Sequence, residues 1–305
     1  MSEFLQRHIG LSKSDQYKML ADLGLSSIDE LVREIVPDSI LLRGDNNRLP
    51  EGCSEQQALK ELKDIASHNI VKRNSIGQGY YETITPPVIQ RNVFENPAWY
   101  TSYTPYQAEL SQGRLEALFN YQTLITELTG LPVANASLLD EGTAAAEAMI
   151  LAHSVGKEDK FIVDSKVFPQ TLAVLETRAK PLGIKIITLD LDDSIPLAEF
   201  KEAFGLIVQL PNNHGKLKHR DGLLKAAEVC NLIKIAIVDP LAQVLMQPVG
   251  ELGYDIAVGS MQRFGVPMGF GGPHAAFFAT IDKYKRKIPG RIVGQSIDSQ
   301  GNKAL

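Results

Sequence analysis

The stretch FIVDSKVFPQTLAVLETRAKPLGIKIITL, residues 161–189, decides the fold class of this chain. It opens with an apolar run at residues 161–163, continues with apolar residues at helical spacing over residues 170–180, and closes with an apolar run at residues 184–189. This pattern predicts a buried strand, an amphipathic helix and another buried strand. Strands that are apolar throughout are typical of parallel sheets covered on both faces.

The same alternation continues along the chain. Further strands are predicted at residues 206–208, 235–239, 256–258 and 275–279, and helices at residues 197–203 and 221–233. Apolar strands that alternate with helices predict an α/β fold with a mostly parallel sheet. In such folds the loops at the carboxyl ends of the strands carry any binding site.

The part of the chain that precedes these strands has a different composition and pattern. Ser27 with Glu30, and Ser54 with Gln57, match the capping-box pattern that opens a helix. Glycine, proline, tyrosine and threonine then crowd residues 75–105, which predicts a loop-rich segment.

Three more helices are predicted, at residues 88–94, 111–129 and 141–154. We therefore expect a helical and loop-rich N-terminal extension at residues 1–95 and a sheet-containing domain at residues 96–305.

Composition limits the function classes. The chain has 305 residues, of which 44% are hydrophobic and 22% charged, as in ordinary globular proteins. Its net charge of −5 argues against a general nucleic-acid binder, and no apolar stretch approaches the ~20 residues of a membrane helix. Cys53 and Cys230 lie far apart, and the histidines show no metal-ligand spacing, so neither a disulfide nor a metal site is predicted. A cytoplasmic protein is expected, because the N-terminus has no targeting pattern.

The loop segment YTPYQ, residues 103–107, carries the best functional signal. It gathers hydroxyl and amide groups just ahead of a long predicted helix, and binding residues are common on loops. The candidate contact residues are Tyr103, Tyr106, Gln107 and Glu109, together with Tyr81 in an earlier glycine-flanked loop. Aromatic packing is the alternative, although Gln107 and Glu109 are polar and need partners.

Two acidic positions also stand at predicted strand or helix ends. Asp239 closes the strand at residues 235–239, where a carboxylate either faces the ligand crevice or caps a nearby loop. Asp140 and Glu141 stand where a loop enters an alanine-rich helix. A helix N-terminus suits an anion, but this acidic pair would repel a phosphate, so a structural or interfacial role is expected.

Five motifs, taken in order, resemble one family, the glycine dehydrogenase (decarboxylating) P-proteins of the glycine cleavage system. The motifs are RHIG at residues 7–10, GYYETITPPVI at residues 79–89, NPAWYTSYTPYQAELSQGRLEAL at residues 96–118, ANASLLDEGTAAAEA at residues 134–148 and GSMQRFGVPMGFGGPHAAFF at residues 259–278. The chain resembles the N-terminal portion of that protein, and its last residues, 297–305, look like a truncation.

The resemblance implies the aspartate-aminotransferase-like fold, that is, pyridoxal-phosphate fold type I. An enzyme of this fold carries its Schiff-base lysine after the strand predicted at residues 256–258. This chain has Gln262 there, and an amide cannot form a Schiff base. Asp239 matches the aspartate that pairs with the pyridine nitrogen of the cofactor. The resemblance therefore implies a vestigial site at Asp239 and Gln262, with no catalytic residue in this chain.

The resemblance also gives roles to loops. Tyr103 becomes the leading contact residue of an active-site wall formed with the other half of the protein. Gly271 and Gly272 lie in a glycine-rich loop whose backbone N–H groups could hold the phosphate of a partner site. A flexible turn between strands stays open as the alternative for these glycines.

The implied activity is that of an oxidoreductase that decarboxylates glycine on pyridoxal phosphate, which the missing half would hold covalently. The aminomethyl group of glycine passes to the lipoyl arm of the H-protein. We expect this chain to be inactive alone and to work with a C-terminal half or a second subunit in a dimeric assembly. A non-catalytic structural subunit of a two-chain enzyme is the alternative. An independent enzyme with another lysine is disfavoured, since residues 259–264 contain none.

Overall fold

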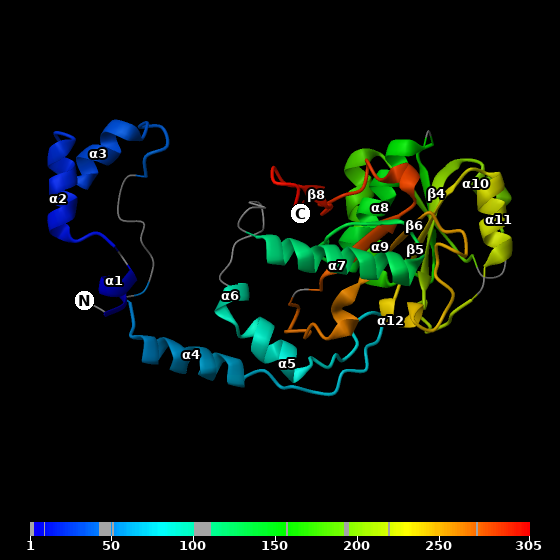
Figure 1. Cartoon of the computed structure of the whole chain (residues 1–305), viewed down its shortest axis with the longest axis horizontal. Helices are drawn as coiled ribbons and strands as arrows, with labels where there is room; N and C mark the ends of the chain where they lie inside the picture. Colours follow the sequence, from blue (N-terminus) through cyan, green and yellow to red (C-terminus); the bar gives the residue numbers. More distant parts are fainter. Residues whose placement is uncertain are drawn as a thin grey trace. The chain divides into compact units, whose positions relative to one another are not determined.

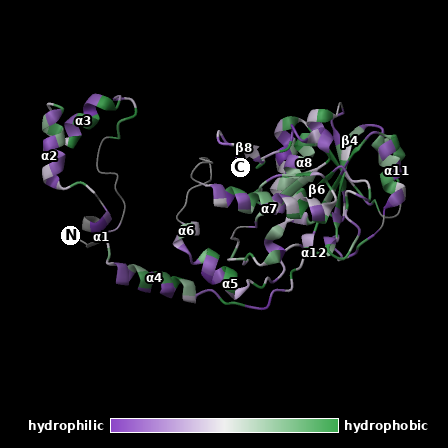
Figure 2. Ribbon diagram, in the orientation of Figure 1, coloured by the Kyte–Doolittle hydropathy of each residue, from purple (hydrophilic) through white to green (hydrophobic). Residues whose placement is uncertain are grey.

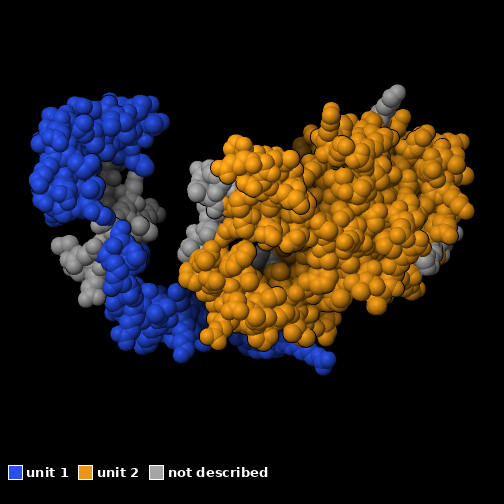
Figure 3. All heavy atoms as spheres, in the orientation of Figure 1, with its two compact units in different colours: residues 1–73 blue, residues 74–305 orange. Residues whose placement is uncertain are grey.

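The computed structural model describes residues 3–8, 10–42, 50, 52–100, 111–156, 158–191, 195–218, 220–272 and 274–305. Contacts divide the chain into two compact units, residues 1–73 and residues 74–305 (Figure 3). This division falls ahead of residue 95, where the sequence placed the end of the extension. Compact units do not by themselves define domains, so the assignment of residues 1–95 and 96–305 stays a prediction.

Unit 1 is helical in its described residues. Its helices are α1 Glu3–His8, α2 Lys13–Asp22, α3 Ile28–Ile35 and α4 Glu55–Ser67. The predicted capping box is complete at α4, where Ser54 Oγ accepts from the Gln57 N–H and Gln57 Oε1 accepts from the Ser54 N–H. At α3 only half of it forms, because the Glu30 carboxylate accepts from the Ser26 N–H at 2.8 Å instead of from Ser27.

A mixed sheet is the centre of unit 2. Among the described residues seven strands pair in the order β1-β7-β6-β5-β4-β2-β3. Figure 1 labels β4, β5 and β6 of this sheet. These strands are β1 Val133–Ala134, β2 Lys160–Asp164, β3 Lys185–Leu189, β4 Ala203–Leu210, β5 Ile233–Val238, β6 Ile256–Ser260 and β7 Ala276–Thr280. Strand β7 runs antiparallel to both of its neighbours, and the other neighbouring pairs are parallel. A separate short pair joins β8 Ser296–Ile297 to β9 Lys303–Ala304.

Helices cover both faces of the sheet. In unit 2 the described α-helices are α5 Pro87–Ile89, α6 Pro97–Tyr100, α7 Gln112–Thr129, α8 Glu141–Val155, α9 Pro169–Ala179, α10 Leu197–Phe200, α11 Asp221–Val229 and α12 Pro240–Gln243. A π-helical turn, η1 Gln90–Phe94, continues α5, and the turn η4 Met261–Phe264 follows β6. The sequence predicted α7 with its stop at Gly130, which adopts a left-handed conformation (φ 67°).

The strands alternate between two buried cores, because successive side chains of a strand point to opposite faces. On one face Phe161 and Val163 pack with the alanine-rich side of α8 and with α9. On the other face Ile162 joins the core that contains Ile125 of α7 and residues of α10 and α11. Apolar residues mark these inner helix faces in Figure 2. The mostly parallel α/β architecture that the sequence predicted is confirmed.

Two predicted helices end earlier than expected, and the sequence analysis missed the two-residue strands β1, β8 and β9. The helix predicted over residues 221–233 ends at Val229, because Asn231 turns to a left-handed conformation (φ 58°) and β5 then begins at Ile233. The helix predicted over residues 197–203 ends at Phe200, and Ala203 already belongs to β4. Strand β1 is only two residues long, which is too short for an alternation of apolar and polar residues to predict it.

Among the described residues, every helix is too short or too polar to cross a bilayer. The cytoplasmic location stays a prediction.

Candidate functional site

A pocket of about 200 Å³ lies at the carboxyl-end edge of the sheet of unit 2. The start of α8 supplies Asp140 and Glu141 to its wall, and α9 supplies Thr171. Ser260 at the end of β6 and His274 complete the polar lining. This is the edge at which parallel α/β sheets carry their binding sites.

Gly79 and Tyr80 line the pocket, and the segment that carries them, residues 74–86, is held to the rest of unit 2 by hydrogen bonds. Gln170 Nε2 of α9 donates to the backbone oxygen of Gln78 at 2.7 Å. Further along, Thr85 Oγ1 donates to the Gly265 oxygen at 2.6 Å, and Thr83 Oγ1 donates to the Val266 oxygen at 3.0 Å. These bonds place Tyr80 on the pocket wall, where its ring meets that of His274 edge-on with 6.1 Å between centroids.

The start of α8 is acidic, as the sequence showed. Asp140 caps the helix, because its Oδ1 accepts from the Thr143 N–H at 2.6 Å. Burial of the Glu141 carboxylate raises its pKa to about 7, and the nearby charges of Asp239 and Asp140 act in the same direction. Hydrogen bonds from Gln209 and Thr171, each at 3.4 Å, partly offset this rise in the pKa.

Asp239 already has a cationic partner within the chain. Its Oδ1 caps α12 by accepting from the Leu241 N–H at 2.8 Å, and its Oδ2 lies 3.2 Å from Nε of Arg263. The Arg263 guanidinium also lies over the ring of Tyr81, with Cζ 4.6 Å from the ring centroid. A carboxylate, a guanidinium and an aromatic ring therefore form one stack inside unit 2.

Gln262 is buried, at 2% exposure, in the turn η4 directly after β6. Its Nε2 has no hydrogen-bond partner among the described residues. An amide cannot form a Schiff base, and the prediction that Gln262 stands at the position of a cofactor lysine stays a prediction.

The pocket does not fit pyridoxal phosphate. The residue after β6 offers no amine, the helix start that would bind the phosphate carries Asp140 and Glu141, and Asp239 is paired with Arg263. An anion at this helix start would meet two carboxylates in a partly desolvated pocket, where charge repulsion is strong.

The glycine-rich loop is closed on itself in this structure. The N–H groups of Gly271 and Gly272 both donate to the backbone oxygen of Met268, at 3.2 and 2.9 Å. Their predicted role in holding a partner's phosphate stays a prediction, and it requires those two bonds to open.

Tyr103, Tyr106, Gln107 and Glu109 lie outside the described residues. Of the predicted wall residues, Tyr81 is therefore the described one, half-buried beneath Arg263. Its contact with substrate stays a prediction.

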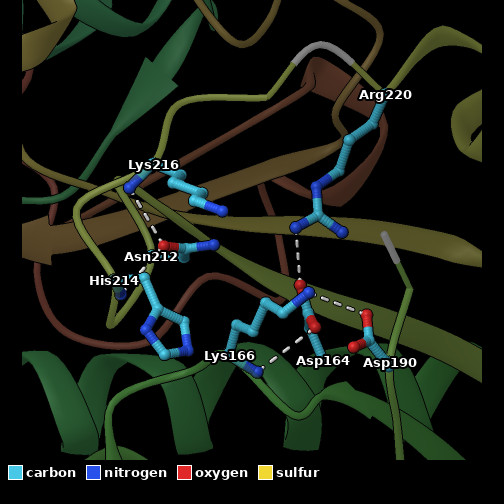
Figure 4. Close-up of polar contacts among 7 residues, drawn as sticks. All are labelled: Asp164, Lys166, Asp190, Asn212, His214, Lys216 and Arg220. Atoms are coloured by element: carbon cyan, nitrogen blue, oxygen red, sulfur yellow. Dashed lines mark hydrogen bonds and ion pairs between the residues drawn. The ribbon is translucent and has the colours of Figure 1, made fainter. Parts of the chain in front are cut away.

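A second polar cluster stands at the carboxyl ends of β2, β3 and β4 (Figure 4). Asp164, which ends β2, lies 2.7 Å from the Arg220 guanidinium, and both side chains are buried. Lys166 reaches Asp190 at 2.9 Å. In the loop after β4, Asn212 Oδ1 accepts from two backbone N–H groups at 3.0 Å each. These bonds tie loops to strand ends, so the cluster is structural.

The sequence analysis assigned no role to three residues in or near the pocket. Arg263 stands beside Gln262, yet its pairing with Asp239 depends on the turn after β6. His274 read as an isolated loop histidine. Gln209 did leave a signal, because it is the single polar side chain in the apolar strand AFGLIVQL.

The glycine cleavage system P-protein family model matches residues 6–305 of the chain. The chain is 58% identical to a Prochlorococcus marinus protein named glycine dehydrogenase (decarboxylating), over 100% of this chain and 32% of that protein. A protein of the same name from Thermosynechococcus vestitus is 53% identical, again over 100% of this chain and 32% of the relative. The chain thus spans about a third of the length of these curated relatives.

One solved structure is similar over nearly the whole chain. It is a glycine decarboxylase (P-protein) of the glycine cleavage system in inhibitor-bound form, with a TM-score of 0.88 and 36% sequence identity. The similarity covers 96% of this chain and 67% of that one. Together with the strand order, it confirms the predicted pyridoxal-phosphate fold type I for the sheet-containing part.

Proposed function

Because this chain belongs to the glycine cleavage system P-protein family, we propose that it is the N-terminal part of a pyridoxal-phosphate-dependent glycine decarboxylase. The whole protein decarboxylates glycine and transfers the remaining aminomethyl group to the lipoyl arm of the H-protein. The names of the cyanobacterial relatives and of the solved structure support this activity.

The buried Gln262 is the observation that supports assigning the cofactor site to the rest of the protein and not to this chain. The fold is present, but the position after β6 holds an amide, and the helix start at α8 holds two carboxylates. The covalent cofactor site therefore belongs to the remaining two thirds of the protein, and this chain contributes no catalytic residue.

The contribution of this chain is a wall of the active site. In this proposal Tyr103, Tyr106, Gln107, Glu109 and Tyr81 supply polar and aromatic contacts to that wall. The ring of Tyr81 is held in place by Arg263, which supports a fixed wall. In the same assembly Gly271 and Gly272 approach the phosphate at the partner site.

Exposed apolar surface supports a further protein partner. Helix α4 exposes Leu59, Leu62 and Ile65 by 69%, 62% and 58%, at spacings that place them on one helix face. Such a stripe is typical of a surface that more protein covers. The C-terminal part of the protein is the proposed occupant, within a dimeric assembly.

A second candidate is a non-catalytic subunit of a two-chain enzyme, and one observation favours it. The chain matches 67% of the solved P-protein chain but 32% of the cyanobacterial relatives, while nearly all of this chain is matched in both cases. The solved chain is therefore about half as long as those relatives, because 0.32/0.67 is about 0.48. The family thus includes a shorter chain that contains this part.

An absorbance titration of the purified chain with pyridoxal phosphate, followed by glycine, tests the division of labour. We expect no saturable band of lysine-bound cofactor and no response to glycine, because neither the amine nor a phosphate site is present. Gln262→Lys is the matched variant, and it too is expected to show no saturable band, since Asp140 and Glu141 remain.

A saturable band that changes with glycine would show that a lysine of this chain performs the chemistry. Borohydride reduction and peptide mapping would then locate that lysine, and the proposed division would be wrong.

A further inference from the structure

The pocket at the start of α8 lies at a helix N-terminus, a position that usually suits an anion. Its own carboxylates disfavour an anion, but the pocket is large enough to hold a small ligand. Its volume is about 200 Å³, well above the ~10–15 Å³ that a single water needs. The charged side chains on its wall are the carboxylates of Asp140 and Glu141, and no lysine or arginine is among the described residues that line it.

No cationic side chain of the described residues pairs with Asp140 or Glu141, so both carboxylates are charged once the pH is above the pKa of Glu141, about 7. Arg263, the nearby cation, is paired with Asp239 at 3.2 Å and stacks on Tyr81. Asp140 is held at the helix N-terminus by the Thr143 N–H. Glu141 accepts only two long hydrogen bonds of 3.4 Å, from the neutral donors Thr171 and Gln209, among the described residues.

A second acceptor stands beside Glu141. Gln209 is 2% exposed, and its Nε2 donates to the Glu141 carboxylate. Its Oε1 is buried with no hydrogen-bond partner among the described residues. A buried acceptor without a donor is costly, but Gln209 is not among the described residues that line the pocket, so Glu141 is the acceptor that a ligand with N–H groups can reach.

Aromatic groups also line the pocket. Tyr80 and His274 both line the pocket, with their rings edge-on to each other. A tyrosine ring face attracts a cation, which adds to the attraction of the carboxylates.

We propose that this pocket binds a small organic cation with N–H donors, of the primary alkylammonium class, with Glu141 as its carboxylate acceptor. The vestigial cofactor site has in this way become a cation site with its own ligand. The inference does not rest on the proposed glycine decarboxylase activity, because it concerns a pocket within this chain alone.

Thermal unfolding of the 305-residue chain with increasing ethylammonium chloride tests the proposal. A ligand that binds only the folded state raises the Tm in a saturable way. We expect a Kd in the millimolar range, because so small a ligand cannot bind more tightly. Tetramethylammonium chloride at equal ionic strength is the matched control, since it has the same charge and no N–H donor.

Variants assign the effect to the pocket. Glu141→Gln keeps the size of the side chain and removes its charge, so the affinity for ethylammonium should fall roughly tenfold or more. Glu147→Gln changes a carboxylate of the same helix that pairs with Arg178 outside the pocket, and it should leave the affinity unchanged. Should Glu141→Gln not fold, Val174→Phe fills the pocket from its wall with both carboxylates intact and should abolish binding.

Several results would overturn the proposal. Equal stabilisation by tetramethylammonium would mean a nonspecific salt effect. Full affinity in Glu141→Gln, or in Val174→Phe, would place the cation elsewhere. Saturable binding of inorganic phosphate, or no saturable effect of ethylammonium through the millimolar range, would show that the pocket is not a cation site.

Discussion

Four side chains argue against a cofactor site in this chain under the proposed function. Gln262 offers no amine, and Asp140 and Glu141 place carboxylates at the start of α8, where a phosphate would need donors. The Arg263 guanidinium lies 3.2 Å from Asp239 and stacks on Tyr81.

The raised pKa of Glu141 has a consequence for stability. In the unfolded chain this carboxyl ionises near its ordinary value of 4.5, whereas in the folded chain its pKa is about 7. Between these pH values the folded state keeps a proton that the unfolded state has released. The stabilisation is therefore complete below pH 4.5 and is lost as the pH rises through 7. Its size is up to about 3 kcal/mol.

Glu141→Gln should remove this pH dependence, and urea unfolding at several pH values between 4.5 and 8 measures it, with the lower limit set by the ordinary pKa. Relative to the unmutated chain, the variant should gain stability as the pH rises through this window. Glu147→Gln on the same helix is the control and should show no such trend. Parallel pH profiles for the unmutated chain and Glu141→Gln would contradict the assignment.

At the scale of elements, the sheet leaves little room where β6 meets its neighbours. Gly259 lies in β6, and a Cβ added there would clash with the backbone oxygen of Val238 in β5. The same Cβ would also lie 2.8 Å from the ring of Phe277 in β7. The glycine therefore allows three strands to pack closely just ahead of the turn that carries Gln262.

Gly259→Ala should destabilise the chain by about 2–4 kcal/mol, because the clash involves backbone in the middle of the sheet. Gly113→Ala provides the control. This glycine is exposed in α7, and an added Cβ there meets nothing within 4 Å. Alanine at that position should stabilise the chain by about 0.5–1 kcal/mol. Equal stabilities of the two variants in urea unfolding would contradict the packing argument.

At the scale of the whole molecule, this chain corresponds to about a third of its relatives. The site it carries lacks the amine that the proposed reaction needs, so activity must come from an assembly. The exposed stripe of Leu59, Leu62 and Ile65 is one surface such an assembly can cover.

Carbon dioxide release from glycine, with lipoylated H-protein and pyridoxal phosphate present, tests this requirement. The two components are this chain and a polypeptide that covers the remaining two thirds of the Prochlorococcus marinus relative. Neither alone should release carbon dioxide, whereas a complex isolated by gel filtration should. Release of carbon dioxide by this chain alone would contradict the proposal.

The class of the fold could be predicted from the order of apolar and amphipathic segments along the chain. Apolar strands that alternate with helices require a sheet buried on both faces. The strands and helices can be recognised from the spacing of apolar residues along the chain. The helix caps at Ser54 and Asp140 and the stop at Gly130 were also readable, because each depends on residues a few positions apart. The assignment of Gln262 to the position of a cofactor lysine came from the family resemblance and stays a prediction.

The partners of the site residues could not be predicted from the sequence and depend on the three-dimensional fold. Asp239 and Arg263 belong to different strand ends, so their pairing follows from the neighbouring positions of β5 and β6 in the sheet. The rise in the pKa of Glu141 likewise depends on burial and on carboxylates brought together by folding. The physical reason is that charge and desolvation act through space, whereas a sequence pattern records only neighbours along the chain.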